Sequence, residues 1–113
     1  MSLGANLRNV WTVATKPFPG AHFATFPPEL VKPCILAGSR PGDTVLDPFG
    51  GSGTTMIAAE RTGRHAVLLE IDPCYVDVIV RRWQEATGDV AVLDGEDRTF
   101  DDIAAARQNQ AAA

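Results

Sequence analysis

Cysteine is scarce in this sequence of 113 residues, which contains only Cys34 and Cys74. They lie far apart and neither belongs to a Cys-x-x-Cys pair, which argues against a zinc site. A disulfide between them stays open, although reduced thiols are favoured. An excess of positive charge is also lacking, because ten Lys plus Arg against fourteen Asp plus Glu give a net charge of −4. That balance is not typical of a stand-alone nucleic-acid-binding domain.

Long hydrophobic runs are absent as well. No apolar stretch approaches the roughly 18 residues of a membrane span, and the first residues lack the charged and apolar regions of a secretory signal. What remains is an ordinary globular composition, with 45% hydrophobic and 21% charged residues. The length suits one small domain with a modest core. We therefore expect a cytoplasmic protein with no membrane partner.

The hydrophobic patterns predict alternating short strands and helices. The expected strands cover residues 9–13, 44–47, 66–71 and 90–93, and the expected helices cover residues 28–37, 54–62 and 72–86. From residue 44 onward the order is β-α-β-α-β, and crossovers of helical length imply parallel strands with right-handed connections. The sequence therefore predicts an α/β fold, one half of a doubly wound Rossmann-like sheet with three parallel strands and flanking helices. Residues 96–113 are expected to form a helical or mobile tail.

A glycine loop joins the first of these parallel strands to its helix: Asp47-Pro48-Phe49-Gly50-Gly51-Ser52-Gly53-Thr54-Thr55. Its glycines allow a backbone to approach a ligand where a Cβ would block it. Ligands of parallel sheets bind outside the carboxyl ends of the strands, where Asp47 and Glu70 both fall. Glu70 follows the loop at a spacing from which an acid can bind both hydroxyls of a ribose.

The residues around the loop narrow the ligand. Met56 stands where a dinucleotide site needs a small residue, and the loop lacks the lysine of a phosphate loop. Asp47 opposes a pyrophosphate but favours an ammonium group, and the amides at the start of the Thr54 helix favour a carboxylate. Ammonium, carboxylate and ribose together describe S-adenosyl-L-methionine. Each feature alone could be structural, as a tight turn, a cap at Asp47 or a solvated Glu70; their conjunction favours a ligand site.

At this point the sequence resembles a known family. The glycine loop resembles the cofactor loop of DNA amino-methyltransferases, which modify the exocyclic nitrogen of adenine or cytosine. The upstream segments Asn9-Val10-Trp11 and His22-Phe23-Ala24-Thr25-Phe26-Pro27-Pro28-Glu29-Leu30 resemble the family segment that precedes that loop. In the beta subclass both follow the catalytic and target-recognition parts, so the resemblance implies a carboxy-terminal cofactor-binding half. It covers about residues 9–95, the expected partial methyltransferase domain, with residues 1–8 as an added or disordered start.

The resemblance also implies roles for single residues, with S-adenosyl-L-methionine as cofactor and no metal. Asp47 would bind the methionine ammonium, Glu70 the ribose hydroxyls, and Ile71 would pack on the adenine. The implied cofactor-binding residues are His22, Ala24, Thr25, Phe26, Asp47, Phe49, Gly51, Ser52, Gly53, Thr54, Glu70, Ile71 and Asp94. A purely structural role for His22 and Phe26, anchoring their loop on the core, stays open.

One family element is missing from the sequence. Members carry an Asp-Pro-Pro-Tyr-type tetrapeptide that grips the amino nitrogen of a flipped base. Here Phe26-Pro27-Pro28-Glu29 has neither the polar first residue nor the aromatic last one, so we assign no catalytic residue. We expect a cofactor-binding half that is inactive alone and acts on double-stranded DNA within a larger methyltransferase. The alternative is a non-catalytic assembly module that works with a separate catalytic chain. The target base and a role in restriction stay open.

Two further expectations concern surfaces. In a complete sheet the strand at 44–47 would lie in the middle, so its bare edge here predicts self-association or pairing with the missing catalytic half. The arginines of the expected helices and their ends are expected to be solvated rather than to form a DNA track. They are Arg61, Arg64, Arg81 and Arg82.

Overall fold

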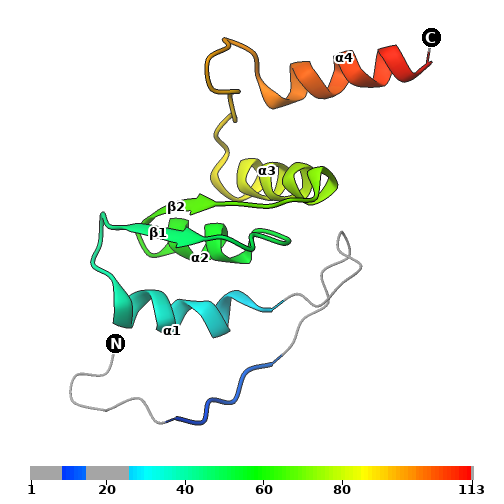
Figure 1. The fold of residues 1–113 in the computed structure, drawn as a ribbon. Coiled ribbons are helices and arrows are strands. Elements are labelled where there is room, and N and C mark those ends of the chain that lie inside the picture. The colour runs from blue at the N-terminus through cyan, green and yellow to red at the C-terminus, as the bar shows by residue number, and fades with distance from the viewer. Residues whose placement is uncertain (1–8, 15–25, 113) are drawn as a thin grey trace.

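Two short parallel strands and a layer of helices behind them form the centre of the protein (Figure 1). The structure is a computed structural model that describes residues 9–14 and 26–112. The elements are α1 (Pro28–Gly38), β1 (Thr44–Asp47), α2 (Thr54–Arg61), β2 (His65–Leu68), α3 (Pro73–Thr87) and α4 (Phe100–Ala112). The expected helices and the first two parallel strands are present, with bounds that shift by at most three residues.

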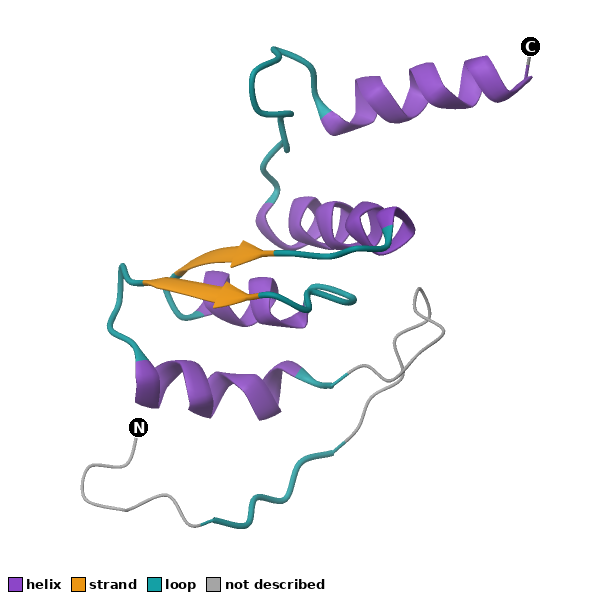
Figure 2. Cartoon of the chain, viewed as in Figure 1, coloured by secondary structure: helices purple, strands orange, loops and turns teal. Residues whose placement is uncertain are grey.

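The sheet has one covered face. β1 and β2 pair in parallel with Val45 beside Ala66 and Leu46 beside Val67. Because side chains alternate along a strand, Val45 and Ala66 point to the same face, where they pack against a core that α1 and α2 supply. That core consists of Ile35, Ala58 and Ala59. Figure 2 shows α2 behind the strands, with α1 on one side of it and α3 on the other.

The third expected strand is wrong. Val92 makes an isolated antiparallel bridge with Thr99, and the Phe100 amide donates to the Ala91 carbonyl at 2.9 Å. Val90–Leu93 therefore belongs to a local hairpin, and Figure 1 shows this segment leaving α3 away from the strands. A hairpin closes a short loop, whereas pairing beside β2 needs a long-range contact. The expected strand at residues 9–13 is also wrong, because described residues 9–14 have no regular structure.

The last helix, α4, has no buried residue. The guanidinium of Arg81 on α3 lies over the ring of Phe100, 5.3 Å from its centre. This contact ties the start of α4 to α3, and Figure 1 shows α4 on the far side of α3 from the strands. Across residues 9–14 and 26–112, no helix has both the length and the hydropathy needed to cross a membrane.

Arg64 is buried rather than solvated, which corrects the expectation for this residue. Its guanidinium donates to the Thr62 carbonyl at 2.7 Å, to the Ser39 carbonyl at 2.9 Å and to the Ser39 hydroxyl at 3.0 Å. Thr62 and Ser39 directly follow α2 and α1. Arg64 therefore joins the carboxyl ends of the two helices by donating hydrogen bonds to carbonyls that the helices leave unpaired.

Arg64→Ala should lower the free energy of unfolding by about 2–3 kcal/mol, because two carbonyls and a hydroxyl lose a charged donor. Urea denaturation followed by circular dichroism measures this loss. Arg61→Ala is the matched control, since Arg61 is exposed and should change stability by less than about 0.5 kcal/mol. Equal effects of the two substitutions would contradict the role given to Arg64.

Candidate functional site

The glycine loop and Glu70 meet at the carboxyl ends of the two strands. Beyond the paired residues, the Leu69 amide donates to the Asp47 carbonyl at 2.9 Å, and the Gly50 amide donates to the Leu69 carbonyl at 2.8 Å. These bonds continue the parallel pairing past both strand ends. They bring Asp47, the loop and Glu70 together at the carboxyl end of the sheet, as the sequence predicted.

Asp47 is held by its own loop. Its Oδ1 accepts from the Phe49 amide at 3.0 Å, and its Oδ2 accepts from the Thr55 hydroxyl at 2.6 Å. The first bond closes a turn at the strand end, and the second ties that turn to the first turn of α2. A carboxylate oxygen can accept more than one hydrogen bond, so both oxygens keep capacity for a further donor. The side chain is half-buried.

Glu70 lies two residues after the end of β2 and contacts the glycine loop from there. Its Oε1 accepts from the Gly51 amide at 2.8 Å and its Oε2 accepts from the Asp72 amide at 3.0 Å. Asp72 in turn caps α3, because its Oδ1 accepts from the Cys74 amide at 2.9 Å. Glu70 thus links the glycine loop to the start of α3, and its carboxylate orientation is fixed by two backbone donors.

Two glycines of the loop are needed for packing on α3. A Cβ on Gly50 would lie 3.1 Å from Cδ1 of Ile79, and a Cβ on Gly53 would lie 3.1 Å from its Cγ1 and 3.3 Å from its Cα. Gly53 also has φ +84°, and Gly51 has φ +56°, values that L side chains rarely adopt. The structure therefore gives a reason for these glycines that needs no ligand. The close approach of the loop backbone to a cofactor stays a prediction for Gly51 and Gly53.

Arg82 is a site residue that the sequence alone did not indicate. It was expected to be solvated, but its Nη1 donates to the Ser52 carbonyl at 2.8 Å and lies 3.3 Å from the Ser52 hydroxyl. Burial lowers the pKa of the Arg82 guanidinium, and the nearby charge of Arg61 lowers it further, while Glu85 raises it. Arg82 shares a helix face with Ile79, three residues earlier, which is the one sequence signal that could have placed it.

The remaining expected residues fall into groups. Ser52 and Thr54 are buried in the loop, while Phe49 and Ile71 are 82% and 99% exposed beside it. Asp94 lies in the exposed turn of the Val92–Thr99 hairpin, and Phe26 lies just before α1. His22, Ala24 and Thr25 lie outside the described residues.

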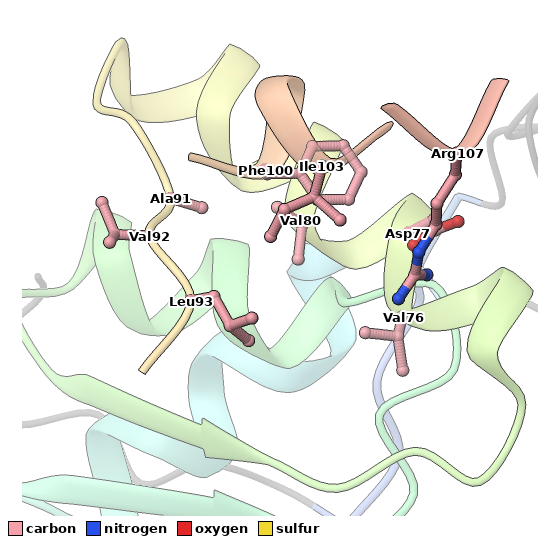
Figure 3. A pocket seen from close by; sticks show the side chains of 9 residues that line it. All are labelled: Val76, Asp77, Val80, Ala91, Val92, Leu93, Phe100, Ile103 and Arg107. Atoms are coloured by element: carbon pink, nitrogen blue, oxygen red, sulfur yellow. The ribbon is translucent and has the colours of Figure 1, made fainter. Parts of the chain in front are cut away.

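A separate hollow of about 220 Å³ lies between α3, the hairpin and α4. Figure 3 shows Val80, Phe100 and Ile103 gathered on its apolar wall. None of the described residues expected at the cofactor site lines it. Among residues 9–14 and 26–112, no group of His, Cys, Asp or Glu side chains could hold a metal ion, and Cys34 and Cys74 are free thiols.

A comparison with known protein families identifies the family of this chain. The profile of a DNA methylase family matches residues 2–81, which is most of the chain. The chain belongs to this family. The resemblance to DNA amino-methyltransferases is thereby confirmed, on a stretch that contains α1, the glycine loop, β2 and the start of α3.

Curated relatives support the assignment. The chain is 52% identical to the type II methyltransferase M.Cfr9I of Citrobacter freundii over 101 residues, covering 89% of this chain and 30% of that protein. It is 47% identical to the type II methyltransferase M.SmaI of Serratia marcescens over 77 residues, covering 68% of this chain and 26% of that one. The chain thus spans less than a third of each of these relatives.

A solved structure shares the fold. A protein of Thermus thermophilus, crystallised with S-adenosyl-L-methionine and described as a putative DNA modification methylase, is 42% identical with a TM-score of 0.55. The match covers 61% of this chain and 30% of that one. It supports an α/β methylase fold for the two-stranded core described above.

Gly53→Ala should destabilise the fold more than Gly63→Ala. Both glycines have positive φ, +84° and +74°, but a Cβ on Gly63 meets nothing within 4 Å. Both substitutions should cost about 1–2 kcal/mol for the left-handed backbone, and Gly53→Ala should cost about 1–3 kcal/mol more for the clash with Ile79. Urea denaturation measures both, and an Ile79→Ala background should reduce the excess. Equal costs for the two glycines would contradict the packing role of Gly53.

Proposed function

We propose that this chain is the S-adenosyl-L-methionine-binding portion of a DNA methyltransferase that methylates the exocyclic amino group of adenine or cytosine. One observation carries the proposal: the carboxylates of Asp47 and Glu70 flank one glycine loop at the carboxyl end of a parallel sheet. Family membership supports the reaction class, and the cofactor bound to the Thermus thermophilus relative supports the ligand.

The proposed ligand matches the site group by group. Asp47 keeps acceptor capacity for the ammonium group of the ligand's methionine part. The first backbone amides of α2 can donate to the carboxylate of that same part. Glu70 is oriented by the Gly51 and Asp72 amides and keeps capacity for the ribose hydroxyls. The exposed side chains of Phe49 and Ile71 offer apolar surface to the methionine chain and the adenine. Residues 9–95 would form this partial domain, and residues 96–113 its tail.

The chain alone is proposed to be inactive in methyl transfer. A base flipped from DNA needs groups that grip its amino nitrogen, and the Asp-Pro-Pro-Tyr-type tetrapeptide is absent from all 113 residues. The acceptor base, and DNA itself, would therefore be bound by the remaining polypeptide of a larger protein or by a separate chain.

Asp47→Asn should weaken binding of S-adenosyl-L-homocysteine by about tenfold or more, because a charged partner of the ammonium is lost. The substitution is isosteric, so the amide side chain that replaces the carboxylate can still bond Phe49 and Thr55, and the loop should keep its shape. Calorimetric titration measures the affinity. Asp43→Asn, the same change at the other end of β1, should leave the affinity within about twofold. No binding by the native chain would overturn the proposed function, and equal losses in both variants would overturn the assignment of Asp47.

We further propose that the open face of the sheet is a contact surface, for a second copy or for the missing catalytic half. Leu46 and Val67, cross-strand neighbours, are 62% and 48% exposed, and Leu69 is 58% exposed on the same side. Neither edge of the two-stranded sheet is paired with another strand in the described part of the chain. Exposed apolar faces and bare edges promote association.

Light scattering at high concentration should give a mass above the 12.1 kDa of one chain. Val67→Lys places a charge on the open face and should shift the protein toward the monomer. Leu36→Lys, at a 43% exposed position on α1, is the control and should leave the mass unchanged. A clean monomer of the native chain would contradict self-association.

A further inference from the structure

Arg82 holds the glycine loop from the side of α3 and takes no part in the ligand contacts proposed above. Its Nη1 donates to the Ser52 carbonyl at 2.8 Å, and it lies 3.3 Å from the Ser52 hydroxyl and 3.5 Å from the Thr54 hydroxyl. Ser52 and Thr54 are both buried, with 6% and 3% of their surface exposed. Three acceptors on two buried residues of one loop therefore lie within 3.5 Å of one guanidinium nitrogen.

The bond to Arg82 fixes one end of the Ser52–Gly53 peptide. At the other end of the same peptide, the Gly53 amide donates to the Gly50 carbonyl at 2.9 Å. Gly53 has φ +84°, and glycine populates either sign of φ with little cost. The backbone dihedrals would thus allow this peptide to turn over at the cost of the Gly53–Gly50 bond, which would aim the Ser52 carbonyl away from Arg82. The charged hydrogen bond from Arg82 opposes that turn.

Arg82 contacts only one part of the proposed site. Its contacts reach the part of the loop that leads into α2, where the ammonium and carboxylate of the ligand are proposed to bind. The ribose and adenine would lie against Glu70 and Ile71, and Glu70 holds the loop at Gly51 through a separate bond of 2.8 Å. Loss of Arg82 should therefore disturb one end of the ligand and spare the other.

We propose that Arg82 is a positioning residue that fixes the Ser52–Gly53 peptide and so shapes the loop for the amino-acid end of S-adenosyl-L-methionine. The ligand half of this inference rests on the proposed function. The half that concerns the loop does not, because it can be measured without a ligand.

Amide hydrogen exchange tests the loop. In Arg82→Gln the Gly53 amide should exchange about tenfold faster, because the peptide loses the charged bond at its other end. The Gly88 amide, which donates to the Gln84 carbonyl at 2.8 Å, should be unchanged. Arg81→Gln removes the neighbouring exposed arginine and should alter neither amide. Arg82→Lys keeps one charged donor and should restore part of the protection at Gly53. Unchanged exchange at Gly53 in Arg82→Gln, or equal acceleration at Gly88, would overturn the inference.

Calorimetry with two probes tests the ligand half. S-adenosyl-L-homocysteine carries the amino acid end, and 5′-methylthioadenosine lacks its ammonium and carboxylate. Arg82→Gln should weaken the first by about tenfold, as expected for loss of preorganisation, and should change the second by less than about twofold. A general loss of folding would weaken both probes alike and would overturn the positioning role. If the native chain binds neither probe, the proposed function fails, and the exchange result still decides whether Arg82 fixes the loop.

Discussion

The close approach of the glycine loop to α3 is the constraint on which the arrangement of the site depends. Gly50 and Gly53 leave room for Ile79, and no larger residue at Gly53 would fit without displacing atoms of α3. Arg82 lies three residues beyond Ile79 on the same helix face. Because α3 comes this close, Arg82 can reach the Ser52 carbonyl. The glycines are thus required first by the protein's own packing, and the room they leave for a ligand is a second use of the same shape.

Charged side chains then fix the loop from three directions. Asp47 holds its start and joins it to α2, Glu70 holds Gly51 from the neighbouring strand, and Arg82 holds Ser52 from the helix layer. The two acids are also the groups proposed to bind the ligand. Substitutions that remove their oxygens would disturb both loop and ligand. At Asp47 an isosteric amide separates the two effects better than alanine does, because the Thr55 hydroxyl can accept a hydrogen bond from the new amide. At Glu70 both oxygens accept from backbone amides, so an amide side chain there would lose one of these bonds. The bonds of Asp47, Glu70 and Arg82 hold the loop without a ligand, so the proposed cofactor would meet a preorganised loop.

The elements around the loop could be located from the sequence, because their signals are local. Pro28 and Gly38 bound α1, Asp72-Pro73 begins α3, and Gly88 ends it. The hairpin at Val92 was misread as a third strand, since a run of apolar residues does not specify its pairing partner. The sequence also predicted that Arg64 and Arg82 would be solvated. No local pattern distinguishes an arginine that faces water from one that donates hydrogen bonds to carbonyls of another element.

By itself the sequence determined the order of elements from α1 to α3, the glycine loop between a strand and a helix, and the two acids at the carboxyl ends of neighbouring strands. Those features follow from periodicity, turn residues and the rule that parallel strands end at one edge. Only the tertiary structure decided that Glu70 bonds Gly51, that Gly53 packs on Ile79 and that Arg82 grips Ser52. These contacts join residues far apart in the chain, and their existence depends on distances of a few ångströms that packing of α2 and α3 sets.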